Sequence, residues 1–209
     1  GWFEEYGNSI PLICRINPAS KEFDAEDFYK AGGIPEVQRQ MKPLLYNDCM
    51  TVTGKTIGEN AASCRSLYPK NPDVITSLEK PFSTLAGLAI MHGNLAPDTA
   101  VAKPAAVAEE VRHFTGKAIC FDSEDAVSDA IAKQLIKPGH VVVVRYEGPK
   151  GAPGMPEMFK PMKLLYGQGL NKCTALITDG RFSGTNNGCF VGHISPEAAA
   201  GGPIALIED

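Results

Sequence analysis

Two polar loops contain the residues whose types and spacing could do chemistry. In the first, residues 177–184 (ITDGRFSG), a buried-strand pattern runs directly into a polar segment flanked by glycines. Functional side chains of α/β folds commonly lie in such loops at strand ends. Asp179-Gly180 and Ser183-Gly184 are also common turn pairs, so the residues alone fit either a functional loop or a plain turn.

The second loop runs from Glu147 to Glu157 (EGPKGAPGMPE) and is too rich in glycine and proline to pack a core. Such a composition lets the backbone approach a ligand closely. We expect Glu157 in the first turn of the helix that follows. There its carboxylate could bind a metal ion, or it could simply complement the helix dipole, a matter of ~0.3–1 kcal/mol. The residues do not decide between these two interpretations.

Two other patterns do not indicate a site. The segment 53–56 (TGKT) resembles the end of a phosphate-binding loop, but that motif needs a glycine where Cys49 stands, so nucleotide binding is not expected. The cysteines are scattered, without a CxxC pair or a histidine at zinc-finger spacing. We therefore expect reduced thiols, and no metal cluster held wholly within this chain. The six are Cys14, Cys49, Cys64, Cys120, Cys173 and Cys189.

Composition limits the partners. The 209 residues, 44% of them hydrophobic, suffice for one sizeable core. A net charge of −4 gives no broad basic field, so no nucleic-acid partner is expected. No apolar stretch approaches the roughly 20 residues that span a bilayer, and the N-terminus lacks the layout of a signal peptide. We therefore expect no membrane association and a cytoplasmic location.

Short strands and helices must position the two loops. Residues 24–31 and 35–43 are expected to form short helices, and residues 47–80 read as connection and site loop. Beyond residue 85, strands alternate with helices, which predicts an α/β layer or a barrel flanked by helices. The expected strands are 88–91, 118–121, 141–146 and 175–178, and the expected helices begin at 122 or 123 and at 156.

Together these segments resemble the dihydroxy-acid dehydratase/phosphogluconate dehydratase family. The matching stretches, in the family's order, are AGGIPEV, TVTGKTIGEN, HGNLAPDTAVAKPA, VVRYEGPKGAPGMPEM, ALITDGRFSG and GHISPEAAAGGPIAL. The resemblance implies an α/β fold whose C-terminal domain is β-barrel-like, of the swivelling β/β/α type, flanked by helices and preceded by a short helical segment of the N-terminal domain. We expect residues 1–46 to be the end of the N-terminal domain and a linker, and residues 47–209 to be the barrel-like domain, truncated at its C-terminus.

The family implies dehydration of a 2,3-dihydroxy carboxylate to a 2-keto acid by a hydro-lyase that uses an iron–sulfur cluster (2Fe-2S or 4Fe-4S) and Mg²⁺. A cation must neutralise the carboxylate and the developing enolate charge, because the proton next to a carboxylate is weakly acidic. By resemblance, Ser183 is the base and Glu157 a Mg²⁺ ligand, while Arg181 and Asn94 contact the substrate carboxylate. The cluster ligands are expected outside this chain, so the chain alone should be inactive.

The resemblance leaves the substrate open. Many dihydroxy-acid dehydratases have a second glycine and a basic residue after the serine, where this sequence has Gly-Thr-Asn-Asn-Gly. A branched-chain amino acid precursor is favoured, and the alternative is a sugar acid (an aldonate or 6-phosphogluconate). A second class of function is a non-catalytic assembly domain, since the family forms homodimers and a fragment can keep an interface.

Overall fold

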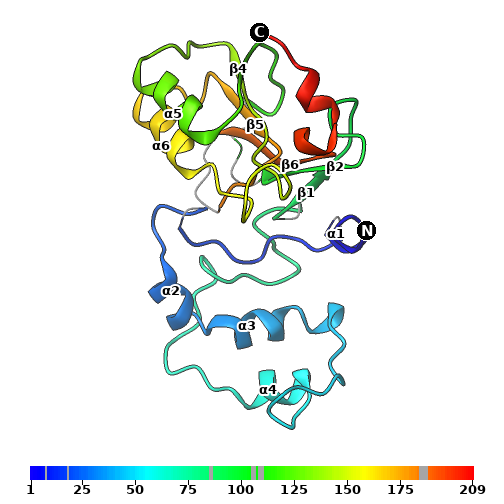
Figure 1. Cartoon of the computed structure of the whole chain (residues 1–209). Coiled ribbons are helices and arrows are strands. Elements are labelled where there is room, and N and C mark those ends of the chain that lie inside the picture. The colour runs from blue at the N-terminus through cyan, green and yellow to red at the C-terminus, as the bar shows by residue number, and fades with distance from the viewer. Residues whose placement is uncertain (8, 18, 85–86, 105–106, 108–110, 184–187) are drawn as a thin grey trace. The chain divides into compact units, whose positions relative to one another are not determined.

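Within the described residues, six strands form one mixed sheet in the unit made of Gly1–Gly7 and Gly87–Asp209 (Figure 1). The structure is a computed structural model that describes residues 1–7, 9–17, 19–84, 87–104, 107, 111–183 and 188–209. The strands are β1 (Ala89–Met91), β2 (Thr99–Ala102), β3 (Lys117–Phe121), β4 (His140–Val144), β5 (Ala175–Thr178) and β6 (Cys189–Ser195). Their order in the sheet is β1-β2-β6-β5-β4-β3.

Strand directions bring several loops to one edge of the sheet. Strands β3, β4, β5 and β6 pair in parallel, β2 is antiparallel to β6, and β1 is antiparallel to β2. Consequently β1 runs in the same direction as the four parallel strands. The loops that follow β1, β3, β4, β5 and β6 therefore all leave from the same edge, which we call the carboxyl edge.

Apolar layers cover both faces of the sheet. Helices α5 (Glu124–Ala132) and α6 (Phe159–Gly167) lie on one side, and the C-terminal turns η4 (Ala198–Ala200) and η5 (Pro203–Leu206) on the other (Figure 1). Side chains alternate along a strand. Accordingly Val142 and Val144 pack with the helices, whereas Val143 packs with Ile194 and Ile204 on the opposite face. Burial on both faces explains the unbroken valine run of β4.

The predicted α/β arrangement is confirmed, but the sheet of the described residues is open. A barrel requires the two end strands to pair. Here β1 and β3 stand at opposite ends of the strand order and are not neighbours, so a closed barrel is not observed.

The unit Asn8–Ala86 is built from short helices. Helix α2 (Ala25–Lys30) begins at the capping residue Asp24, and α4 (Ile57–Ser63) begins at Thr56; in both, a capping box satisfies the first backbone N–H groups. Helix α3 (Gly33–Gln40), where a helix was expected at 35–43, and the turn η1 (Lys42–Leu44) lie between them in sequence. Helix α4 was not expected, because residues 47–80 read as a connection. The TGKT segment thus ends in a helix cap. The remaining helix, α1 (Trp2–Gly7), belongs to the other unit.

No helix in the described part of the chain is long and apolar enough to cross a bilayer. The expected boundary between residues 46 and 47 stays a prediction.

Candidate active site

The backbone joins the two candidate loops directly. Glu157 and Arg181 form an isolated parallel β-bridge. The N–H of Met158 donates to the carbonyl of Arg181 at 2.8 Å, and the N–H of Arg181 donates to the carbonyl of Pro156 at 3.4 Å. The segment that carries Glu157 therefore lies beside the loop that carries Arg181 and Ser183.

Glu157 does not lie in a helix. The expectation that it occupies the first turn is wrong, because Glu157 forms an isolated β-bridge with Arg181, and α6 begins only at Phe159, after the capping residue Met158. The residue is exposed. Its carboxylate therefore faces solvent at the end of the Gly/Pro loop, where a ligand can reach it.

Asp179, directly after β5, is 1% exposed and ties three loops together. Its Oδ1 accepts the N–H of Glu147 at 2.9 Å. Its Oδ2 accepts the N–H of Tyr146 at 3.1 Å and that of Ala198 at 2.8 Å. Charge-assisted bonds to backbone N–H groups offset the cost of burying the carboxylate. Asp179 thus fixes the loops that leave β4, β5 and β6.

Glu197, 7% exposed, holds the middle of the Gly/Pro loop. Its carboxylate accepts the N–H of Lys150 at 2.8 Å and 3.0 Å, and the N–H of Gly151 at 3.0 Å. A Cβ atom at Gly148 would overlap the Glu197 carboxylate, and one at Gly151 would overlap the carbonyl of Tyr146. The glycines of this loop are therefore required by close packing at these two positions.

Glu147, at the start of the same loop, is 6% exposed. Its Oε1 accepts the N–H of Glu124 at the beginning of α5. Desolvation by burial raises the pKa of Glu147, and the nearby carboxylates of Glu124 and Asp179 raise it further, against the lowering effect of the Glu124 N–H bond. Of the two carboxylates that bracket the loop, Glu147 thus serves the scaffold and Glu157 is the accessible one.

A polar cavity of about 470 Å³ opens at the carboxyl edge. Asp98, Asp179 and Glu197 are among the residues that line it. Asn94 lies in the turn between β1 and β2, where the N–H of Ala96 donates to the carbonyl of Gly93 at 3.1 Å, and it is exposed. Asn94 thus shares this edge of the sheet but is not among the residues that line the cavity. Its contact with substrate stays a prediction.

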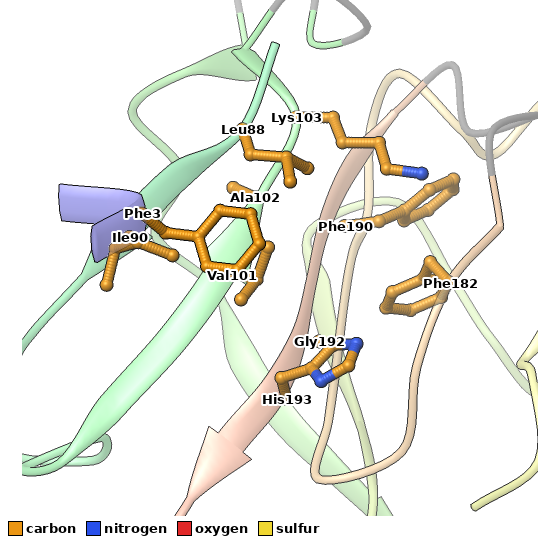
Figure 2. A pocket seen from close by; sticks show the side chains of 10 residues that line it. All are labelled: Phe3, Leu88, Ile90, Val101, Ala102, Lys103, Phe182, Phe190, Gly192 and His193. Carbon is orange, nitrogen blue, oxygen red and sulfur yellow. The ribbon is translucent and has the colours of Figure 1, made fainter. Parts of the chain in front are cut away.

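An apolar cavity of about 270 Å³ adjoins the Ser183 loop (Figure 2). Phe182 forms part of its wall and stacks on Phe190, with ring centres 5.5 Å apart and planes at 18°. Lys103 and His193 also line it. Desolvation lowers the pKa of His193, and the positive charges of Arg181 and Lys103 lower it further. The positive charges of Arg181 and Lys103 therefore act on His193.

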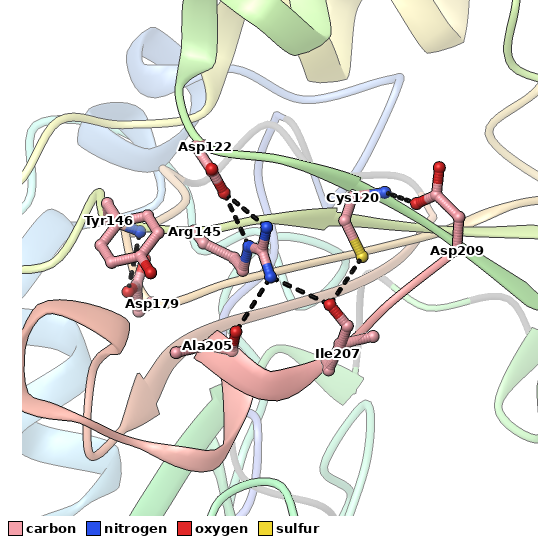
Figure 3. A network of polar contacts seen from close by, with 8 residues as sticks. All are labelled: Cys120, Asp122, Arg145, Tyr146, Asp179, Ala205, Ile207 and Asp209. Carbon is pink, nitrogen blue, oxygen red and sulfur yellow. Dashed lines mark hydrogen bonds and ion pairs between the residues drawn. The ribbon is translucent and has the colours of Figure 1, made fainter.

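Arg145, directly after β4, holds the C-terminal segment to the sheet (Figure 3). Its Nε donates to Asp122 Oδ1 at 2.7 Å, and its Nη1 donates to the carbonyls of Ala205 at 3.0 Å and Ile207 at 2.9 Å. The guanidinium fork suits several fixed acceptors at once. The next residue, Tyr146, donates its N–H to Asp179. The contacts of Arg145, which we call the Arg145 clasp, therefore lie next to the site loops in sequence.

Metal-binding groups are sparse. Among the described residues, no group of three or more His, Cys, Asp or Glu side chains could hold a metal ion. The six cysteines are free, and only Cys49 and Cys64 are exposed.

The expected departure from the family pattern after Ser183, at Thr185, Asn186 and Asn187, lies outside the described residues.

Sequence patterns identified both loops but missed the carboxylates that shape them. The residues alone fitted either a functional loop or a plain turn at Asp179-Gly180. Glu197 lay in the matching stretch GHISPEAAAGGPIAL with no role assigned to it. The available signal for Asp179 was an acidic residue that directly follows a buried strand.

Two family models match this chain. The family model described as dihydroxy-acid/6-phosphogluconate dehydratase C-terminal matches residues 73–209, and its N-terminal counterpart matches residues 2–60. The chain therefore belongs to the dihydroxy-acid/6-phosphogluconate dehydratase family.

Three similar relatives each carry the name dihydroxy-acid dehydratase. The protein of Aquifex aeolicus is 49% identical over 207 residues, and that of Acetivibrio thermocellus is 48% identical over 207 residues; both alignments cover 98% of this chain. The protein of Anaeromyxobacter dehalogenans is 46% identical over 209 residues, 99% of this chain. The chain spans 37% of the length of each of these relatives.

Proposed function

We propose that this chain forms part of an iron–sulfur, Mg²⁺-dependent hydro-lyase that converts a 2,3-dihydroxy carboxylate into a 2-keto acid. Family membership and the names of the relatives support this reaction class. The observation that carries the proposal is the β-bridge between Glu157 and Arg181, because it sets the accessible carboxylate beside the loop that ends in Ser183.

In this proposal Ser183 removes the proton from C2 of the substrate. The C2–H electron pair forms the C2–C3 double bond as the C3–O bond breaks. The departing hydroxide accepts the proton that Ser183 took from C2, which forms water and restores the alkoxide, and the resulting enol tautomerises to the 2-keto acid. A serine is a weak base unless its alkoxide is stabilised. The positive charge of Arg181, two residues away, favours that anion and orients the substrate carboxylate.

The residues of this chain fit Mg²⁺ as contributors of one ligand. Glu157 offers an exposed carboxylate, the hard oxygen ligand that this cation prefers. When bound, Mg²⁺ neutralises carboxylate and enolate charge, and the iron–sulfur cluster acts as a Lewis acid toward the departing hydroxyl. The cluster ligands and the remaining Mg²⁺ ligands are proposed to lie outside this chain, so that the chain alone is inactive.

The finer features follow from the same family resemblance. We propose the swivelling β/β/α fold for the complete domain, a cytoplasmic location, and a homodimer as the working form. For the substrate, the names of the relatives favour a branched-chain precursor over a sugar acid.

The test uses the complete enzyme that contains this chain, reconstituted anaerobically with iron, sulfide and Mg²⁺. Turnover is measured with 2,3-dihydroxyisovalerate and a panel of aldonic acids. Ser183→Ala should abolish turnover and leave the cluster absorbance intact. Ser128→Ala makes the same change at a buried position on α5 and should leave turnover unchanged. Retained turnover in the Ser183 variant removes this residue from the mechanism.

A further inference from the structure

In the described part of the chain, the side-chain carboxylate of Asp179 is hydrogen-bonded by backbone N–H groups alone. Its acceptor atoms take the N–H groups of Tyr146, Glu147 and Ala198, and no described Lys or Arg side chain pairs with it. Burying a carboxylate without a cation is costly, and an uncharged turn would link β5 to the next segment without that cost. We therefore infer that the carboxylate has a structural role that a simple turn could not fill. It fixes the positions of the three backbone N–H groups that donate to it.

The three donors belong to the loops that matter for the proposed reaction. Tyr146 and Glu147 begin the Gly/Pro loop that ends at Glu157, and Ala198 begins the turn η4 after β6. One side chain from the loop that carries Ser183 thus sets the position of the loop that carries Glu157.

The connection from Asp179 to Ser183 is fixed at Gly180 and at Arg181. The N–H of Gly180 donates to Thr178 Oγ1 at 2.9 Å, and the carbonyl of Gly180 accepts the N–H of His193 at 2.8 Å. A Cβ atom at Gly180 would come within 3.0 Å of the Glu147 Cβ, so the two loops touch here. Arg181 is then held by its bridge to Glu157.

We propose that Asp179 is a positioning residue: its carboxylate sets the placement of the Ser183 hydroxyl relative to the Glu157 carboxylate without touching the substrate. The inference rests on the proposed function, because the roles of Ser183 and Glu157 come from there. Misplacement of reacting groups by about 1 Å can cost ~100-fold in rate. Loss of the Asp179 bonds therefore acts on the chemical step rather than on substrate binding.

Asp179→Asn in the complete enzyme is the direct test. The side chain keeps its shape, but its NH₂ group cannot accept an N–H, so one of the two acceptor atoms is lost. We expect kcat to fall by about 10- to 100-fold with KM changed by less than about threefold, the pattern of an interaction needed in the transition state. The cluster absorbance should not change.

Two threonines at opposite ends of β5 supply a second variant and its matched control. Thr178→Val removes the acceptor that fixes the N–H of Gly180, next to Asp179. Thr174→Val makes the identical change just before β5, where Thr174 Oγ1 donates to the carbonyl of Leu170 at 2.8 Å. Both hydroxyls are buried. We expect Thr178→Val to lower kcat less than Asp179→Asn does, and Thr174→Val to leave kcat unchanged.

Hydrogen exchange gives a readout that needs no turnover. In Asp179→Asn, the amides of Tyr146, Glu147 and Ala198 should exchange at least about tenfold faster, whereas Thr174→Val should leave them protected. Should Asp179→Asn fail to fold, the comparison of the two threonine variants decides the question.

The outcomes separate this inference from the proposed function. Unchanged kcat in both Asp179→Asn and Thr178→Val, or an equal loss of kcat in Thr174→Val, overturns the positioning role. A wild-type enzyme that turns over none of the acids overturns the proposed function instead, and the exchange data then still report whether Asp179 orders the loops.

Discussion

Glu157 lies directly opposite Arg181 in a parallel bridge, although the two residues belong to loops that follow different strands. The pairing needs the carboxyl ends of β4 and β5 to be neighbours, which their parallel register from Val141 with Ala175 to Val144 with Thr178 provides. The side chain of Glu157 is thereby presented next to the segment that continues to Ser183. The bridge is a backbone contact, and the convergence of the Glu157 and Ser183 side chains on one pocket stays a prediction.

Glu157→Gln should weaken the binding of Mg²⁺ to the complete enzyme. The amide keeps the shape of the side chain but loses the negative charge that Mg²⁺ prefers. We expect the Mg²⁺ concentration for half-maximal activity to rise by about tenfold or more, equivalent to ~1.4 kcal/mol. A titration of activity with Mg²⁺ measures it.

Asp125→Asn is the control for that titration. Its carboxylate lies on α5, is 95% exposed, and has only a loose surface pair with Lys160 at 3.7 Å. The control should titrate like the wild type. If Glu157→Gln also does so, Glu157 is not a Mg²⁺ ligand.

The sequence predicted those strands and helices whose own residues show a clear hydrophobic pattern. The valine run of β4 and the apolar stripe of α5 carry their own periodicity, and both elements were predicted to within a few residues. Strands β2 and β6 were not predicted. Strand β2 is a short TAVA segment, and β6 contains Gly192 and His193, the latter with a left-handed φ of 54°, which breaks the alternating pattern.

The same distinction applies to the site. Glycine, proline and acidic residues indicated both loops, because loop composition is a local property. The role of Asp179 depends on N–H donors 33, 32 and 19 residues away in sequence, so no local pattern contains it. The helix expected at Glu157 was wrong for a related reason, since pairing with Arg181 overrides the local preference.

Glu147→Gln should stabilise the fold at neutral pH and not at acidic pH. Burial raises the folded-state pKa of Glu147 above its ordinary value of 4.5. Stability linked to this carboxyl is therefore complete below pH 4.5 and is lost as the pH rises through the folded-state pKa. Glutamine keeps an acceptor for the N–H of Glu124 without the charge. We expect a higher unfolding midpoint at pH 7, by ~2–4 °C per kcal/mol gained.

Thermal unfolding at pH 7 and pH 4 measures this difference. Glu208→Gln, at an exposed position, should give the wild-type midpoint at both values. A midpoint of Glu147→Gln that is raised equally at both pH values, or lowered at pH 7, contradicts the assignment of a charge penalty to Glu147.

Gly151→Ala should disrupt the Gly/Pro loop. Its Cβ atom would overlap backbone atoms of Tyr146, which cannot move aside as a flexible side chain would, and the N–H of Gly151 is bonded to Glu197. We expect destabilisation of about 1–3 kcal/mol, measured by denaturant unfolding, and faster exchange of the Lys150 amide. Gly167→Ala, at the end of α6 with nothing near its Cβ position, should be neutral or stabilising by up to about 1 kcal/mol. Equal behaviour of the two variants argues against the packing constraint.

Arg145→Lys should release the C-terminal segment while leaving the sheet folded. The guanidinium bonds Asp122 and the carbonyls of Ala205 and Ile207 together (Figure 3), and a lysine cannot reproduce that fork. Hydrogen bonds to charged groups contribute ~1.5–3 kcal/mol each, so losing one carbonyl contact suffices to open the segment locally.

Hydrogen exchange of the Ala205, Ile207 and Cys120 amides measures this opening, because the Cys120 N–H is bonded to Asp209 in the same segment. We expect these amides to exchange about tenfold faster, whereas those of β5 keep their protection. Lys160→Gln, which removes a cation from the exposed pair with Asp125, should change none of them. Since Arg145 directly precedes Tyr146, faster exchange that spreads to the Tyr146 amide indicates that the clasp also supports the Asp179 contacts. Full protection of Ala205 and Ile207 in the lysine variant shows instead that apolar packing of Ile204 alone holds the segment.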